Sequence, residues 1–126
     1  MKCTPDNITE LGPNEVFTFG SNTAGIHGAG AARRAHLVFG AVYGLGEGLM
    51  GKSYALPTLD DSLQRRTQDE LTGSIHKFYD CCDHNLHLTF LLTKVGCGLA
   101  GYDEPYIISL FHGQVRPPNI IWPKRW

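Results

Sequence analysis

The sequence has no long apolar run and no large excess of charge of either sign. Its purely apolar stretches are only a few residues long in a chain of 126 residues, which excludes a membrane-spanning helix. Eleven basic and twelve acidic residues give a net charge of −1. The broad basic surface of many nucleic-acid-binding proteins is therefore absent. We expect no membrane partner, and the near-neutral charge argues against a nucleic-acid partner.

The sequence also lacks the cysteine spacing of a metal site. Its four cysteines, Cys3, Cys81, Cys82 and Cys97, include no C-x-x-C pair, which is a common spacing of zinc ligands. We therefore expect no metal ion, and no motif indicates a cofactor. The first six residues have no apolar core of a secretory leader. The cysteines are accordingly expected to be free thiols in the reducing cytoplasm.

Glycine, in contrast, is abundant, with 15 residues in 126 against a usual share of about 7%. The glycines gather in three loops, at residues 20–30, 44–51 and 95–101. The length of the chain suits a single domain over residues 1–126.

The hydrophobic pattern predicts strands that alternate with helices. Strands are expected at 15–19, 53–58, 86–93 and 119–122, and helices at 31–43, 63–83 and 103–112. This alternation is typical of an α/β fold whose mostly parallel sheet is flanked by helices.

The helix patterns also predict inner and outer faces. In the first helix, Ala32, Ala35, His36 and Phe39 share the inner stripe, and Arg33 and Arg34 lie on the other side. The second helix is expected to be capped by residues 60–62 and to bury Leu63, Leu71, Ile75 and Phe78.

Two glycine loops, residues 20–30 and 95–102, each follow a predicted strand and precede a predicted helix. Ligands of α/β proteins bind at this position, because glycine lets backbone N–H groups approach an anion and the helix dipole favours negative charge. If the strands at 15–19 and 86–93 are neighbours, the two loops face each other across one crevice, which suits a diphosphate. The alternative is that these glycines only make tight turns.

The third glycine loop matches a nucleotide-binding pattern in the wrong context. Residues 46–53 fit G-x-x-x-x-G-K-[ST], the P-loop. A P-loop needs a strand before it and a helix after it, whereas here a helix precedes and a strand follows. We therefore do not expect a nucleoside triphosphatase.

Five side chains in the glycine loops are candidates for binding or chemistry. The amide of Asn22 could bond a ribose hydroxyl or serve as a turn residue. His27, expected to be exposed, could contact a phosphate or act as an acid or base. Glu47 could reach a sugar hydroxyl or remain solvated. Cys97 could be a nucleophile at a helix start or a small packing residue, and Tyr102 could stack on adenine or ribose or belong to the core.

Three segments, residues 19–32, 53–58 and 95–102, resemble a family of short phage and bacterial proteins. That family is similar to a minimal macrodomain, the ADP-ribose-binding fold. The resemblance implies a three-layer α/β fold. It implies that Asn22 and Gly28–Gly30 lead into the first helix, and that Gly96–Gly101 cradles a diphosphate. The chain has Asn7–Thr9 but not the Gly-Asp-Ile that supplies the adenine-binding acid in macrodomains, so no adenine-binding residue is assigned.

The resemblance implies binding of ADP-ribose or a related NAD-derived nucleotide diphosphate, with hydrolysis of an ADP-ribosyl linkage as an additional activity. It also implies a cytoplasmic location, that of the bacterial host if a phage encodes the protein. Asn22 and His27 are the expected catalytic residues. The residues expected to bind the ligand are Gly20, Ser21, Asn22, Gly25, His27, Gly28, Ala29, Gly30, Glu47, Gly96, Cys97, Gly98, Leu99, Ala100, Gly101 and Tyr102. The alternative is a non-catalytic structural or interaction protein that retains the fold.

Overall fold

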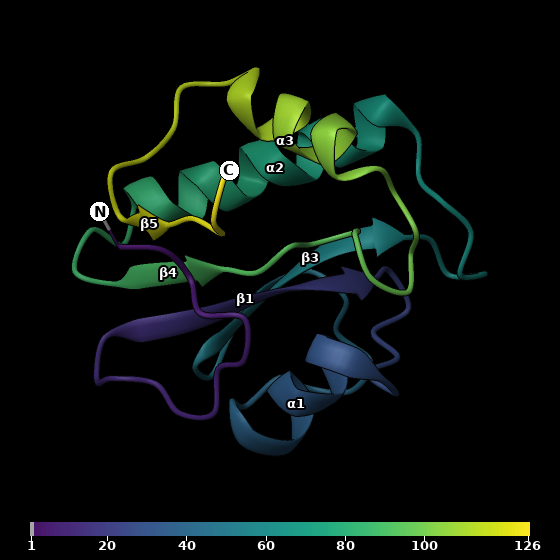
Figure 1. Ribbon diagram of the computed structural model, residues 1–126. Coiled ribbons are helices and arrows are strands. Elements are labelled where there is room, and N and C mark those ends of the chain that lie inside the picture. The colour runs from purple at the N-terminus through teal and green to yellow at the C-terminus, as the bar shows by residue number, and fades with distance from the viewer. Residues whose placement is uncertain (1) are drawn as a thin grey trace.

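The chain forms a five-stranded sheet with helices on both of its faces. The computed structural model describes residues 2–126. The elements in chain order are β1 (Glu15–Asn22), α1 (Gly30–Val38), β2 (Gly48–Met50), β3 (Ser53–Leu59), α2 (Gln68–Asp83), β4 (Thr89–Leu92), α3 (Glu104–His112) and β5 (Ile120–Ile121). Helix α1 covers one face of the sheet, and α2 and α3 cover the other (Figure 1). The expected α/β fold with a helix-flanked sheet is confirmed.

Strand β1 lies at the centre of the sheet, whose strand order is β2-β3-β1-β4-β5. It runs parallel to both neighbours, β3 and β4, and β5 is parallel to β4. Strand β2 alone is antiparallel, so the sheet is mixed and mostly parallel, as expected. Because β1, β3 and β4 are parallel, their carboxyl ends meet at one edge of the sheet (Figure 1).

Two bounds near the first glycine loop differ from the prediction. Strand β1 continues past Gly20 to Asn22, because Ser21 and Asn22 still pair with the end of β3. Helix α1 ends at Val38 rather than near residue 43. Gly40, in the left-handed region at φ 82°, follows the end of this helix; glycine adopts that conformation without the steric penalty that other residues meet.

The loop at residues 44–51 contains a strand that the sequence did not predict. Strand β2 pairs with β3, and the residues between the two strands form a tight turn. Lys52 belongs to this turn region, and its ammonium group donates to the carbonyl oxygens of Leu11 and Gly12 at 3.3 and 2.9 Å. A strand follows the motif where a P-loop would have a helix, as the sequence indicated.

The predicted start of the second helix is wrong. Helix α2 begins at Gln68, after a capping box in which Thr67 and Glu70 exchange hydrogen bonds between side chain and backbone at 2.9 and 3.2 Å. Asp60 does not cap this helix; its Oδ1 accepts from the N–H groups of Ser62 and Gln64, both at 2.9 Å. These bonds hold a turn, so Leu63 lies outside the helix and is exposed.

Two apolar cores lie on the two faces of the sheet. The larger one packs α2 and α3 on the sheet and includes Leu71, Ile75 and Phe78 on the predicted inner face of α2. The smaller one packs α1 on the sheet around Phe19 and Phe39. Within residues 2–126, no helix has the length and apolar character that a membrane crossing needs.

Two substitutions in α2 are expected to shift stability in opposite directions. Thr67→Ala removes the capping hydrogen bond and should lower the free energy of unfolding by about 1 kcal/mol. Gly73 is an exposed helical residue, and nothing lies within 4 Å of the Cβ that alanine would add there. Gly73→Ala should therefore raise the free energy of unfolding by roughly 0.5–1 kcal/mol. Equilibrium unfolding in urea measures both, and a loss of stability in Gly73→Ala would contradict the assignment of this helix.

Candidate functional site

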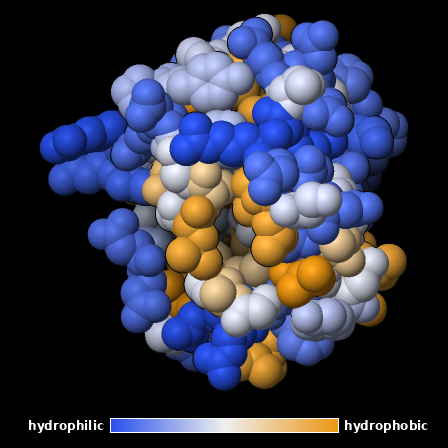
Figure 2. Space-filling view, turned by 90° about the vertical axis from the view of Figure 1, so that its right-hand side faces the viewer, coloured by the Kyte–Doolittle hydropathy of each residue, from blue (hydrophilic) through white to orange (hydrophobic). Residues whose placement is uncertain are grey.

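A cleft of about 1210 Å³ opens at the edge where the parallel strands end. Its walls come from the β1–α1 loop and the β4–α3 loop, and the ends of β1 and β3 form its floor. Figure 2 shows the cleft as a hollow in this face of the molecule. The two glycine loops thus face each other across one crevice, which was expected if their strands were neighbours.

The two loops lie close together because the pairing of β1 with β4 continues beyond the end of β4. The N–H and the hydroxyl of Thr93 both donate to the carbonyl oxygen of Thr18, at 3.1 and 2.7 Å. Two residues further on, β1 and the second loop approach so closely that a Cβ added to Gly20 would lie 3.2 Å from the backbone nitrogen of Gly96. A side chain at Gly20 would therefore press on the backbone of the second loop, and one at Gly96 would meet Tyr102 and Ile107 at 3.1 and 3.4 Å.

The amino end of α1 reaches the cleft without a capping side chain. Its N-cap residue is Ala29, and its first turn contains no acidic residue. The residues from Gly28 to Ala32 line the cleft. The first backbone N–H groups of a helix have no partner within the helix, and they favour an anion at this end. The amino end of α1 therefore contributes a positive potential to this part of the cleft.

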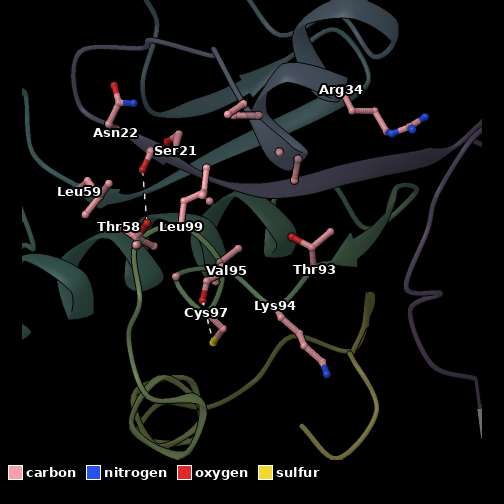
Figure 3. Close-up of a pocket in the computed structure, with 18 of the residues that line it drawn as sticks. Ser21, Asn22, Arg34, Thr58, Leu59, Thr93, Lys94, Val95, Cys97 and Leu99 are labelled. Atoms are coloured by element: carbon pink, nitrogen blue, oxygen red, sulfur yellow. Dashed lines mark hydrogen bonds between the residues drawn. The ribbon is translucent and has the colours of Figure 1, made fainter. Parts of the chain in front are cut away.

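Most of the residues expected to bind a ligand line this cleft. Those that do are Gly20, Ser21, Asn22, Gly28, Ala29, Gly30, Gly96, Cys97, Gly98, Leu99 and Ala100. Figure 3 shows Ser21 and Thr58 on its floor, with Cys97 and Leu99 from the β4–α3 loop beside them. The glycine clusters alone were sufficient to find these two walls.

Asn22 lines the cleft, but its side chain holds the loop together. Its Nδ2 donates to the carbonyl oxygen of Ile26 at 2.9 Å, and its Oδ1 accepts from the N–H of Ile26 at 3.0 Å. This pair of bonds closes the turn at the start of the β1–α1 loop. The sequence left Asn22 either as a ribose-binding residue or as a turn residue, and these two hydrogen bonds support the turn role.

The expectation that His27 is exposed is wrong, because only 2% of its surface is accessible. Its Nε2 lies 3.0 and 3.2 Å from the carbonyl oxygens of Val42 and Leu45 and therefore carries the proton. The ring packs against Phe19, His36 and Tyr43. His36, which was expected on the buried stripe of α1, is itself exposed. His27 does not line the cleft, so it joins two loops rather than contacting a ligand there.

Four more of the expected ligand-binding residues lie outside the cleft. Gly25 is buried, and its carbonyl oxygen accepts from the N–H of Gly44 at 2.8 Å. Glu47 pairs with Lys77 at 3.6 Å. Gly101 is exposed beyond the cleft wall, and the buried Tyr102 donates its hydroxyl to the carbonyl oxygen of Thr58 at 2.7 Å. Tyr102 therefore anchors the β4–α3 loop to the end of β3.

Cys97 lines the cleft as a weakly acidic thiol. Burial, together with the nearby carboxylate of Glu104, raises the pKa of Cys97 to about 11. Its Sγ lies 3.5 Å from the carbonyl oxygen of Val95 and can donate to it. Because the thiolate is the nucleophilic form, this environment suits the packing role that the sequence offered as the alternative for Cys97.

Sequence reasoning missed several residues of the cleft. Arg34 was expected on the outer side of α1, yet it lines the cleft, as do Lys94 and the segment Pro5–Ile8. The segment reaches this place because Thr4 pairs with Pro123, beyond the end of β5. A pairing over more than a hundred residues leaves no local signal, and only the comparison of Asn7–Thr9 with the macrodomain pattern drew attention to this part of the chain.

Comparison of the chain with models of protein families, with curated proteins and with solved structures gave no match in any of the three. The resemblance to macrodomains therefore remains a prediction from residues 19–32, 53–58 and 95–102.

The raised pKa of Cys97 predicts how it reacts with iodoacetamide. At pH 7.5 almost all of this thiol is protonated, so the exposed Cys3 should be alkylated well before it. The rate at Cys97 should rise about tenfold for each pH unit between 7 and 10, as the thiolate fraction grows. Mass spectrometry of the alkylated peptides measures both rates. Fast alkylation of Cys97 at pH 7 would instead indicate an activated nucleophile.

Proposed function

We propose that the protein binds ADP-ribose or a related NAD-derived nucleotide diphosphate in the cleft. The observation that carries the proposal is the meeting of two glycine loops, from the adjacent parallel strands β1 and β4, at the uncapped amino end of α1. The diphosphate lies between the loops, where backbone N–H groups and the helix dipole stabilise its negative charge.

One cationic side chain of the cleft, that of Arg34, supports an anionic ligand. Arg34 forms no ion pair with any residue from 2 to 126, so its guanidinium is available to a phosphate. The carboxylate of Glu104 accepts from the indole N–H of Trp126 at 2.8 Å and lies 3.8 Å from Lys94. The second acid of the cleft, Asp6, lies outside the two glycine loops.

The proposal is binding rather than hydrolysis. Of the two residues expected to be catalytic, His27 lies outside the cleft and Asn22 bonds to Ile26 through both ends of its amide. General acid–base catalysis needs a proton donor or acceptor within hydrogen-bond reach of the reacting group. Neither Asn22 nor His27 has a free donor or acceptor in the cleft. Hydrolysis of an ADP-ribosyl linkage is therefore not part of the proposal, and the assay below tests for it separately.

Gly28→Val tests the proposal. Gly28 lines the cleft, and nothing lies within 4 Å of the Cβ that a substitution would add, so the variant should fold. Wild type should bind ADP-ribose in calorimetric titration and AMP more weakly, because AMP lacks the diphosphate. The added isopropyl group occupies the space of the diphosphate, and it should weaken ADP-ribose binding at least about tenfold, a loss of about 1.4 kcal/mol.

Gly73→Val is the matched control, because Gly73 also has open space around it but lies in α2, away from the cleft. It should bind ADP-ribose as wild type does. Absence of ADP-ribose binding by wild type would overturn the proposal and favour the interaction protein that only retains the fold. Release of ADP-ribose from an ADP-ribosylated protein, tested in parallel, would add hydrolysis to binding.

A further inference from the structure

The β4–α3 loop forms one wall of the cleft, yet its outer part has few bonds to the rest of the molecule. Residues 98–100 line the cleft, and the first two of them are exposed. The N–H of Gly101 donates to the carbonyl oxygen of Gly98 at 3.0 Å, and that of Tyr102 donates to the carbonyl oxygen of Gly96 at 2.9 Å. These bonds join the loop to itself, so they shape it without fixing its position against the rest of the cleft.

The backbone of this stretch has little to hold its orientation. Gly96 and Gly101, at its two ends, are both in the left-handed region, at φ 78° and 74°, and glycine restricts the direction of the chain less than any other residue does. The N–H groups of residues 98–100 have no hydrogen-bond partner among residues 2–126. These N–H groups are therefore available to an anion, but the loop itself does not orient them.

The guanidinium group of Arg65 ties this loop to the β3–α2 loop. Its Nε donates to the carbonyl oxygen of Ala100 at 3.2 Å, and its Nη2 donates to that of Gly101 at 2.6 Å. Its central carbon lies 5.1 Å from the centroid of the Tyr102 ring, within the range of a cation–π contact. Among residues 2–126, no other residue from outside the loop bonds to the backbone of residues 97–101.

Arg65 is itself held at the end of β3. It pairs with Leu59, the last residue of that strand, in an isolated antiparallel bridge. The N–H of the next residue, Arg66, accepts no freedom either, because it donates to the hydroxyl of Tyr102 at 2.9 Å, and the Arg66 guanidinium donates to the carbonyl oxygen of Pro57 at 2.8 Å. The Arg65 side chain therefore joins the floor of the cleft to its second wall.

We infer that Arg65 is a positioning residue of the cleft, which clamps Ala100 and Gly101 so that the N–H groups of residues 98–100 are ordered before the ligand binds. This inference rests on the proposed function, which places the diphosphate between the glycine loops. Arg65 does not line the cleft, so it acts through the loop. Peptide groups are planar, so the two held carbonyl oxygens fix the peptide planes that follow these N–H groups. A loop ordered in advance loses less conformational entropy on binding.

The clamp needs the shape of arginine as well as its charge. Nε and Nη2 lie in one rigid plane and reach two successive carbonyl oxygens, whereas the ammonium group of lysine is a compact charge on a flexible stem. Arg65→Lys keeps the charge and removes the planar fork, and Arg65→Ala removes both. Because the Arg65 side chain is exposed, both variants should fold.

Calorimetric titration with ADP-ribose tests the role in binding. Arg65→Ala should bind about tenfold more weakly than wild type, and Arg65→Lys should show most of this loss. Arg116→Lys is the matched control, because the Arg116 guanidinium also lies 5.1 Å from an aromatic ring, that of Trp122, and neither residue lines the cleft. Arg116→Lys should bind ADP-ribose as wild type does.

Backbone order parameters from ¹⁵N relaxation test the clamp in the ligand-free protein. In wild type, residues 98–100 should have values of about 0.85, as rigid backbone has, and Arg65→Lys should lower them below about 0.6. Saturation with ADP-ribose should raise them again in the variant, because the diphosphate then binds the N–H groups. A role limited to fold stability would instead lower the urea midpoint and leave both the order parameters and the affinity unchanged.

Four results would overturn the inference: an Arg65→Lys variant with wild-type affinity, order parameters that the substitution does not change, order parameters that stay low with ADP-ribose bound, and an equal loss of affinity in Arg116→Lys. In each of these cases ADP-ribose still binds wild type, so the proposed function stands. If wild type does not bind ADP-ribose, the proposed function fails and the inference fails with it.

Discussion

The close approach of two backbones, at Gly20 in β1 and Gly96 in the β4–α3 loop, is the constraint on which the cleft depends. A Cβ on Gly20 would lie 3.2 Å from the nitrogen of Gly96. The parallel pairing of β1 with β4, extended by both bonds from Thr93, brings the two loops to this distance. The glycine loops face each other because these two strands are neighbours.

The polar residues of the loops act mainly as scaffold. Asn22 closes a turn on Ile26, His27 joins the first loop to the carbonyl oxygens of Val42 and Leu45, and Tyr102 ties the second loop to Thr58. Buried polar groups usually have partners; the bonded atoms here take backbone groups as partners, whereas His27 Nδ1 is buried without a partner among residues 2–126. The surface left at the cleft is therefore mostly backbone and small or apolar side chains, which suits recognition of a diphosphate by N–H groups.

The turn that carries Leu63 lies where local sequence pattern predicts the start of a helix. Asp60, which local pattern places at a helix start, instead holds this turn through its backbone and its carboxylate. Helix α2 starts at the capping box of Thr67 and Glu70, which is also a sequence pattern. The acidic and hydroxyl residues at 60–62 fit a helix start as well, and the prediction used them instead. Between these two points the chain is free to present Leu63 to the cleft rather than to the core.

Apart from β2, local pattern determined which segments are strands and helices. It also determined the α/β class, the face of α2 that buries Leu71, Ile75 and Phe78, and the two glycine loops that form the cleft walls, because periodicity and glycine content act over a few residues. Tertiary structure alone decided the strand order, the pairing that makes β2 and extends β1 to Asn22, the burial of His27, and the placement of Arg34 and Pro5–Ile8 at the cleft. These features depend on contacts between residues far apart in the chain, such as Thr4 with Pro123. No short window of sequence encodes them, since a strand specifies its own two faces but not its neighbours.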